Sequence, residues 1–319
     1  MFDLCPRRLR AQAAFVALTA LVACGGGAGS NDPVPLRILL PPSFPEAVLP
    51  ETPASAAERA YYARTQETLL SSGLLRTDGG GTDAPFDADD LTENFLKIAF
   101  YDEYDPALNN LVQKEAPSTL SRWAQPVRVS VEFGPSVSLE RQATERARVE
   151  SYLARLSALT GHSISMNEQR ANFVLYIGSV DERRALGPRL RQMLPGLSPE
   201  LERGVTQMGH ANFCLVYVNT DLTGRLKERA MAVIPSELPD LMGLMCLHEE
   251  LAQGLGLGND SRSARPSIFN DDNEFATLTP QDELMLRLLY SPALRPGMTE
   301  AEARPVAESL AGRFFGGKT

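Results

Sequence analysis

The residue types that could carry chemistry gather in one stretch, Cys246 to Asp260, which has the pattern of a helix ending in a glycine-rich turn. A helical metal site requires two ligands one turn apart, a glutamate after the first ligand, and a third ligand beyond a glycine turn. If His248 is the first ligand, the second position is Ala252, which has no donor atom, and Leu255 replaces the glycine. This register therefore fails at two positions.

All the spacings fit when the same pattern begins one residue later. The first ligand, the general base, the second ligand, the turn glycine and the third ligand are then Glu249, Glu250, Gln253, Gly256 and Asn259, with Asp260 as an alternative third ligand. Helical periodicity supports this register independently, because the apolar stripe of the segment includes His248 and places that side chain on the core side. Glu249 and Gln253 share a different face of the helix.

The donor atoms of this second register do not suit zinc. Zinc sites use imidazole or thiolate with few carboxylates, whereas Glu, Gln and Asn coordinate through oxygen and two of the three are uncharged. The set suits a hard cation such as calcium weakly, so the sequence predicts no definite cofactor and leaves zinc or calcium as alternatives. Glu249 and Glu250 could instead form a carboxyl pair in which one raised pKa permits metal-free acid/base work. We expect a degenerate, non-catalytic site, with hydrolysis or a purely structural helix as alternatives.

Hydrophobic periodicity predicts the elements that position this segment. A half-buried strand is expected over 127–133, followed by a long helix over 139–159 and strands over 164–166, 172–177, 212–218 and 229–234. Helices are also expected over 54–75 and 89–101, and a proline-broken helical insertion over 181–208. After the focal segment, Thr279 and Thr299 open two more helices. This order predicts an α/β (α+β) fold with one mixed sheet and a helical C-terminal part.

The N-terminus has the layout of a lipoprotein signal peptide. Arginines at 7, 8 and 10 form a positive region, residues 11–20 form a short apolar region, and Leu21-Val22-Ala23-Cys24 has the small-residue form of a lipoprotein cleavage site. A lipid such as palmitate on Cys24 would anchor the protein to a membrane without a transmembrane helix. The alternative is a plain secretory signal with an incidental cysteine.

This reading divides the chain into five segments. They are a signal peptide over 1–23, the lipidated Cys24 with a flexible Gly/Pro/Ser-rich tether over 24–55, an N-terminal helix and linker over 56–86, a single domain over 87–313, and a tail over 314–319.

Charge and cysteine usage restrict the partners and the compartment. The formal net charge is -9 and no Lys/Arg cluster is present beyond the arginines of the expected signal peptide, so no nucleic-acid partner is expected. Once Cys5 leaves with the signal and Cys24 is lipidated, Cys214 and Cys246 remain. In an oxidising compartment these two residues either form a disulfide or stay as two buried free thiols.

Four further features have simpler expected roles. Trp123 is expected to be a core anchor. His210 precedes a strand and is either satisfied locally or reaches the cleft, and His162 follows a helix end and complements its dipole. The acidic run 271–274 is a solvated loop, or a source of extra oxygens for a calcium site beside the focal segment.

The segments 249–260, 267–272 and 282–290 resemble an uncharacterised proteobacterial family of lipoproteins, known only as a domain of unknown function. More distantly, the layout resembles the metzincin peptidases, with a strand and helix first, then an edge strand, an active-site helix with its glycine turn, a tight turn and a C-terminal helix. In this resemblance Ser267-Ile268-Phe269 occupies the place of the methionine turn, with Phe269 where methionine would stand. Glu249, Gln253 and Asn259 (or Asp260) then replace the three histidine ligands.

Together these features predict a lipid-anchored protein of the bacterial cell envelope. The resemblance to lipoproteins implies the outer membrane, facing the periplasm, because Gly25 rather than aspartate follows the cysteine. The metzincin-like domain is expected to bind a peptide or an envelope component in a degenerate cleft, without the usual zinc proteolysis. The alternatives are a metallopeptidase-like or metal-free hydrolase with Glu250 as general base, and a non-enzymatic envelope assembly factor.

Overall fold

The computed structural model describes residues 49–104, 113–270 and 272–316. Residues Ala47–Thr319 form one compact unit. The expected signal peptide, the lipidation site Cys24 and most of the expected tether lie outside the described residues. No helix within the described ranges is long and apolar enough to cross a membrane.

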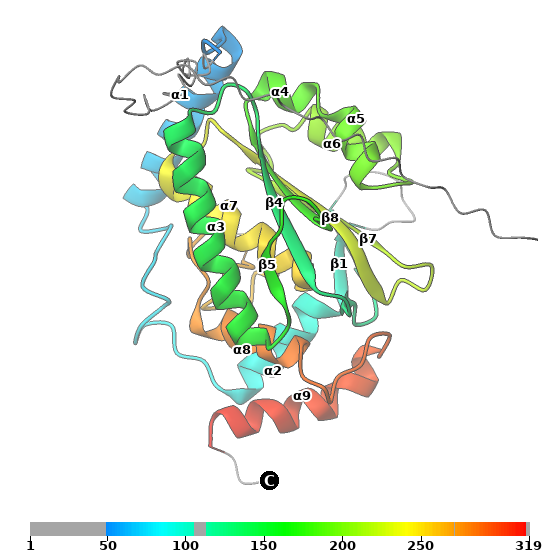
Figure 1. Cartoon of the computed structure of the whole chain (residues 1–319). Helices are drawn as coiled ribbons and strands as arrows, with labels where there is room; N and C mark the ends of the chain where they lie inside the picture. The colour runs from blue at the N-terminus through cyan, green and yellow to red at the C-terminus, as the bar shows by residue number, and fades with distance from the viewer. Residues whose placement is uncertain (1–48, 105–112, 271, 317–319) are drawn as a thin grey trace, which may run out of the picture. The chain divides into compact units, whose positions relative to one another are not determined.

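The centre of the unit is a mainly parallel sheet, in which the described residues supply six strands (Figure 1). The strands are β3 (Arg122–Trp123), β4 (Val127–Phe133), β5 (Ile164–Met166), β6 (Phe173–Gly178), β7 (Leu215–Thr220) and β8 (Leu226–Pro235). Hydrogen-bonded neighbours follow the order β3-β8-β6-β4-β5, and β7 pairs with β8 in the antiparallel sense. Strands β3 and β6 pair with successive parts of the same edge of β8. Lys227 of β8 pairs with both Trp123 and Thr220, so β3 and β7 lie on opposite edges of β8.

Helices cover both faces of this sheet (Figure 1). One face carries α3 (Leu139–Thr160) and α7 (Asp240–Leu255), and the other carries α4 (Val180–Arg184), α5 (Gly187–Met193) and α6 (Pro199–Thr206). Strand β6 is buried on both faces, so its alternate side chains enter different cores. Phe173 and Leu175 join the larger core with α3 and α7, whereas Val174 and Tyr176 join the smaller core with α5 and α6.

The remaining elements surround one end of the sheet and the N-terminal end of α7. They are α1 (Pro53–Ser71), α2 (Ala88–Ala99), the antiparallel pair β1 (Tyr101–Tyr104) and β2 (Gln113–Pro117), α8 (Pro280–Leu289) and α9 (Glu300–Phe314). Helices α2, α8 and α9 pack together near the end of α3 (Figure 1). Capping boxes at Asp87, Thr279 and Thr299 fix where these three helices begin.

The sequence predicted the fold class correctly, and the differences concern short elements. The strand expected over 127–133 is β4, and the helix expected over 139–159 is α3. The strand expected over 212–218 begins only at Leu215 and continues to Thr220. Strands β1, β2 and β3 were not expected, because their largely polar sequences show no alternation of apolar and polar residues.

Helix α1 begins within the expected tether and docks on the domain through buried polar groups. Thr52 accepts a hydrogen bond from the Ser55 N–H and caps the helix. The Ser55 hydroxyl donates to Glu237 Oε1 at 2.9 Å, and Arg183 Nη1 donates to Glu237 Oε2 at 2.9 Å. Arg183 is 2% exposed and Glu237 is fully buried. The buried ion pair of Arg183 and Glu237 therefore joins α4 to the segment before α7, and α1 contributes a further hydrogen bond to it through Ser55.

We expect Glu237→Gln to lower the free energy of unfolding by about 3–5 kcal/mol, because it leaves the buried Arg183 without a counter-charge. Urea unfolding of the purified protein measures this change. Glu51→Gln is the control, since Glu51 forms an exposed ion pair with Arg59 at 2.8 Å and its loss should change stability by less than about 0.5 kcal/mol. Equal stabilities of the two variants would contradict the structural role given to the buried pair.

Candidate functional site

Helix α7 carries the focal segment and is buried along most of its length. It packs against β7 and β8 on one side and against α3 on another. No side chain caps its start at Pro239, but the Gln66 Oε1 of α1 accepts a hydrogen bond from the Met242 N–H at 3.2 Å. One of the N-terminal N–H groups of α7 is thereby satisfied from outside the helix.

Two glycines let α7 approach its neighbours closely. A Cβ at Gly254 would lie 2.5 Å from the Phe173 ring, so the helix touches the sheet through backbone at this point. Gly256 ends the helix with φ of 136°, and a Cβ there would lie 2.6 Å from the Ser121 carbonyl oxygen. The turn position of the second register therefore requires glycine for both conformation and space.

The structure brings together some of the expected ligand positions and separates others. Gln253 Nε2 donates to Asp260 Oδ1 at 3.2 Å, so these two side chains meet beyond the glycine turn. Asn259 is 3% exposed, and its Nδ2 donates to the Lys97 carbonyl of α2 at 3.0 Å. The amide of Asn259 thus fastens the turn to α2, a role that the ligand spacing did not reveal.

The two glutamates differ in exposure. Glu250, the candidate general base, is 3% exposed, whereas Glu249 is half-buried. Within the described ranges, no three His, Cys, Asp or Glu side chains lie close enough together to hold a metal ion. Among the described residues, Glu249 and Glu250 of α7 are therefore not part of a cluster of acidic, imidazole or thiolate side chains that could bind a metal ion.

His248 belongs to the core, as the apolar stripe predicts. It is 8% exposed and stacks on Tyr152 of α3, with ring centroids 4.0 Å apart and planes at 10°. Its Nδ1 accepts a hydrogen bond from the Leu278 N–H at 3.0 Å, which requires an unprotonated nitrogen. Burial lowers the pKa of His248 from 6.5 to about 3, so the ring is neutral at pH 7.

The turn Ser267-Ile268-Phe269 is buried and is held by one carboxylate of α8. Asp282 accepts from the Ser267 hydroxyl at 2.6 Å and from the Ile268 N–H at 3.1 Å, and it also caps α8 through Thr279. Phe269 is fully buried in the same core as α7. Burial raises the pKa of Asp282 to about 6, and the four donors that face the carboxylate oppose this effect.

One carboxylate of the acidic loop after this turn, that of Glu274, pairs with two arginines. Glu274 accepts from Arg76 Nη1 at 2.8 Å and from Arg265 Nε at 2.6 Å. Both contacts lower the pKa of Glu274. The carboxylate of Glu274 therefore serves ion pairing between the linker after α1 and this loop, while Asp271 lies outside the described residues.

The remaining cysteines and histidines have structural surroundings. Cys214, just before β7, and Cys246 of α7 form a disulfide with Cα atoms 5.9 Å apart. His210 stacks on Tyr61 of α1 at 3.7 Å between centroids, and its Nε2 lies 2.9 Å from Glu58 Oε2. It therefore faces α1.

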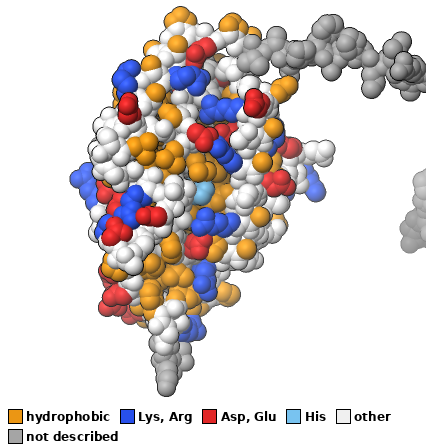
Figure 2. All heavy atoms as spheres, turned by 90° about the vertical axis from the view of Figure 1, so that its left-hand side faces the viewer, with side chains coloured by type: hydrophobic (Ala, Val, Ile, Leu, Met, Phe, Trp, Pro, Cys, Tyr) orange, Lys and Arg blue, Asp and Glu red, His pale blue; other side chains and the backbone are white. Residues whose placement is uncertain are grey.

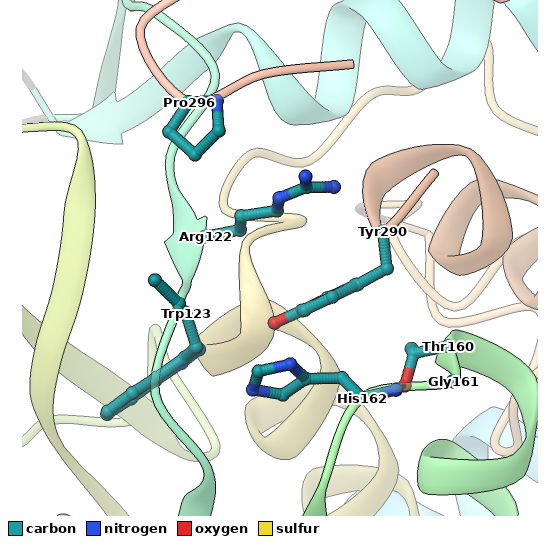
Figure 3. A pocket seen from close by; sticks show the side chains of 8 residues that line it. Arg122, Trp123, Thr160, Gly161, His162, Tyr290 and Pro296 are labelled. Atoms are coloured by element: carbon teal, nitrogen blue, oxygen red, sulfur yellow. Dashed lines mark hydrogen bonds between the residues drawn. The ribbon is translucent and has the colours of Figure 1, made fainter. Parts of the chain in front are cut away.

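A pocket of about 300 Å³ lies at the C-terminal end of α7, and none of its lining residues is among the expected ligand positions (Figure 3). Its lining comes from four separate parts of the chain and comprises Arg122, Trp123, Ala124, Thr160, Gly161, His162, Tyr290 and Pro296. Trp123 is 2% exposed and donates from Nε1 to the Gly254 carbonyl at 2.9 Å. Tyr290 donates from its hydroxyl to the Leu255 carbonyl at 3.1 Å.

Comparison with known protein families matches residues 88–309 to one family, described as a protein of unknown function (DUF2927). The chain belongs to the DUF2927 family. The DUF2927 region begins at the first residue of α2 and ends within α9, so α7 and the pocket lie inside it and α1 lies before it. No curated protein and no solved structure matches the chain.

The outer surface of the DUF2927 domain mixes charges of both signs. Figure 2 shows Lys and Arg side chains interspersed with Asp and Glu side chains on the face that lies at the left of Figure 1. Two of the ion pairs formed by arginines of α3 reach other helices, Arg148 with Asp240 at 2.7 Å and Arg155 with Glu283 at 2.6 Å. These pairs tie α3 to α7 and α8 at the surface.

Acid should destabilise the DUF2927 domain through His248. Below pH 6.5 the unfolded chain binds a proton at this residue, whereas the folded chain stays neutral until about pH 3. The free energy of unfolding should therefore fall by about 1.5–2 kcal/mol between pH 6.5 and pH 5 from this group alone. Urea unfolding of the wild type and of His248→Gln, at both pH values, measures the effect.

In His248→Gln the amide oxygen can still accept from the Leu278 N–H, but the side chain does not titrate. Between pH 6.5 and pH 5, the free energy of unfolding of the variant should therefore fall by about 1.5–2 kcal/mol less than that of the wild type. Asp282 has a raised pKa and acts in the opposite direction between pH 4 and pH 6, but it is present in both proteins and cancels in the difference. Identical pH dependence of the two proteins would contradict a neutral, buried His248.

Proposed function

We propose that this protein is a lipid-anchored component of the bacterial cell envelope that binds an extended peptide segment and does not cut it. In this proposal the anchor is Cys24, at the end of the signal peptide, and the binding surface is formed by β7 with the adjacent face of α7. The bound segment belongs to a peptide or to an envelope protein.

The observation that carries this proposal is the edge position of β7. Among the described residues, β7 pairs with β8 alone, so no described strand occupies its second edge. A strand edge presents backbone N–H and C=O groups, and an extended peptide can pair with them as an additional strand. The disulfide from Cys214 to Cys246 and the packing of α7 on β7 hold this edge in a fixed position.

The hydrogen bonds of the expected ligand positions support binding without catalysis. Asn259 donates its amide to the Lys97 carbonyl, and Gln253 donates its amide to Asp260. Both side chains contribute uncharged donors to the fold, in positions where a zinc peptidase would need imidazole nitrogens. The glycine turn at Gly256 and the buried turn at Phe269 lie where the resemblance to metzincins expects them, and this supports a peptide-binding cleft with different side chains.

The order of elements supports the distant likeness to metzincins. Strand β4, helix α3, strands β5 and β6, the antiparallel edge strand β7, strand β8 and helix α7 occur in this order along the chain, with α4, α5 and α6 inserted between β6 and β7. This is the order expected of that resemblance, with α7 in the place of the active-site helix. The likeness concerns architecture and supports a peptide as the ligand.

The anchor can be tested in a bacterial host that processes lipoproteins. We expect the full chain to fractionate with membranes and to incorporate radiolabelled palmitate, and Cys24→Ser to lose the label and enter the soluble fraction. Cys5→Ser is the matched control, because Cys5 lies within the expected signal peptide and its variant should remain membrane-bound. A Cys24→Ser protein that keeps its label would contradict the proposal.

The peptide site can be tested by selecting ligands from a displayed random-peptide library on the purified protein. We expect selected peptides to slow amide hydrogen exchange in β7, to remain intact, and to bind Glu250→Gln as well as the wild type. Phe269→Leu alters the buried turn and leaves the sequence of β7 unchanged. It controls for changes in hydrogen exchange that come from altered stability of the whole domain. Stoichiometric zinc together with peptide cleavage that Glu250→Gln abolishes would establish the hydrolase alternative instead.

A further inference from the structure

The pocket at the end of α7 combines a cation, a neutral histidine and aromatic walls (Figure 3). It lies on the β3 side of β8, whereas the proposed peptide surface lies on the β7 side, so the present inference does not rest on the proposed function. Its volume of about 300 Å³ is at the lower end of the range of small-molecule sites.

Arg122 is a half-buried cation that pairs with carbonyl groups and with no described carboxylate. Its Nη1 donates to the carbonyls of Leu289 and Ser291, and its Nη2 donates to the Leu294 carbonyl at 2.9 Å. A guanidinium has five N–H donors, so the Nε–H and one Nη2–H donate to no residue in the described part of the chain. Burial lowers the pKa of Arg122, as expected for a cation without a counter-charge.

His162 supplies an acceptor on the same pocket. Its Nε2 lies 2.9 Å from the Gln125 carbonyl oxygen, which can only accept, so the hydrogen of the neutral ring is on Nε2. The Nδ1 lone pair is then available, and no hydrogen bond to Nδ1 is formed by the described residues. Burial lowers the pKa of His162, so the neutral ring dominates at pH 7.

The ring of Tyr290 lies between these two polar groups. The Arg122 Cζ is 5.6 Å from the centroid of this ring, and the His162 centroid is 5.1 Å from it. Figure 3 shows Arg122 on one side of Tyr290 and His162 on the other, with Trp123 and Pro296 forming the neighbouring wall. A ligand that reaches both polar groups must therefore lie along an aromatic surface.

We propose that this pocket binds a small organic carboxylate with a planar apolar body and a hydrogen-bond donor at its far end. The carboxylate accepts from the Nε–H and Nη2–H of Arg122 and supplies the counter-charge that the described residues lack. The donor group binds Nδ1 of His162, and the apolar body packs on Tyr290. The same chemistry occurs in a free hydroxyaryl acid and in the C-terminal tyrosine of a peptide.

The lone tryptophan of the chain makes the site directly observable, because Trp123 lines this pocket. We would titrate the purified protein with 4-hydroxybenzoate, with 4-hydroxybenzamide and with benzoate, and follow Trp123 fluorescence. The acid should bind at least about tenfold more tightly than its neutral amide, because only the carboxylate pairs with Arg122. It should also bind more tightly than benzoate, which lacks the donor for His162.

Two variants separate recognition from structural effects. Arg122→Lys keeps the charge but loses the forked donors, and should weaken 4-hydroxybenzoate about tenfold or more. His162→Phe should abolish the preference for 4-hydroxybenzoate over benzoate while leaving benzoate affinity nearly unchanged. His210→Phe, a histidine on α1 outside the pocket, should change neither affinity. If Arg122→Lys fails to fold, the acid-to-amide ratio of the wild type and the His162→Phe result still decide the matter.

A pair of short peptides ending in tyrosine, one with a free carboxyl terminus and one amidated, identifies the source of the carboxylate. Tighter binding of the free-ended peptide than of 4-hydroxybenzoate supports a chain terminus as ligand, and tighter binding of the small acid supports a free acid. Equal affinity for 4-hydroxybenzoate and 4-hydroxybenzamide, or a fluorescence response that persists unchanged in both variants, would overturn the proposal.

Discussion

The position of α7 depends on aromatic side chains that donate hydrogen bonds to its backbone carbonyls. Tyr152 of α3 donates to the carbonyl of His248, Trp123 of β3 to that of Gly254, and Tyr290 after α8 to that of Leu255. The last two acceptors belong to the final turn, whose carbonyls have no partner within the helix. Because α7 ends in the interior, the bonds from Trp123 and Tyr290 satisfy carbonyl groups that would otherwise be buried without a partner. All three bonds together fix the helix against three elements.

Much of the fold could be predicted because its principal elements have strong periodicity. The alternation of β4 and the apolar stripe of α3 are visible in the sequence, and cap residues mark the starts of α8 and α9. The candidate site was less predictable. Spacing along α7 identified the residues that lie one turn apart, but it could not show that the Asn259 amide would meet a carbonyl of α2. The pocket could not be predicted because its lining residues come from distant parts of the chain, and local sequence patterns do not show which distant residues come into contact.

Ion pairing explains how a chain with an excess of acidic residues joins its N-terminal part to its family domain. Arg76 lies outside the DUF2927 region and pairs with Glu274 inside it. It also pairs with Asp78 and Asp83, which lie outside the region as well, and it lowers the pKa values of both. Ser55 and Gln66 of α1 also bond to groups inside the family region. The region matched to the family therefore leaves out residues of the N-terminal part that take part in the fold.

The disulfide between Cys214 and Cys246 has a consequence for when folding can be completed. It links two residues 32 positions apart, and closing a loop of this length removes conformational entropy from the unfolded chain worth about 3–4 kcal/mol. This stabilisation is absent wherever thiols are kept reduced. If the chain is exported as proposed, it would hold β7 against α7 by packing alone while it is still in the cytoplasm, and it would be easier to unfold for transport until oxidation closes the bond.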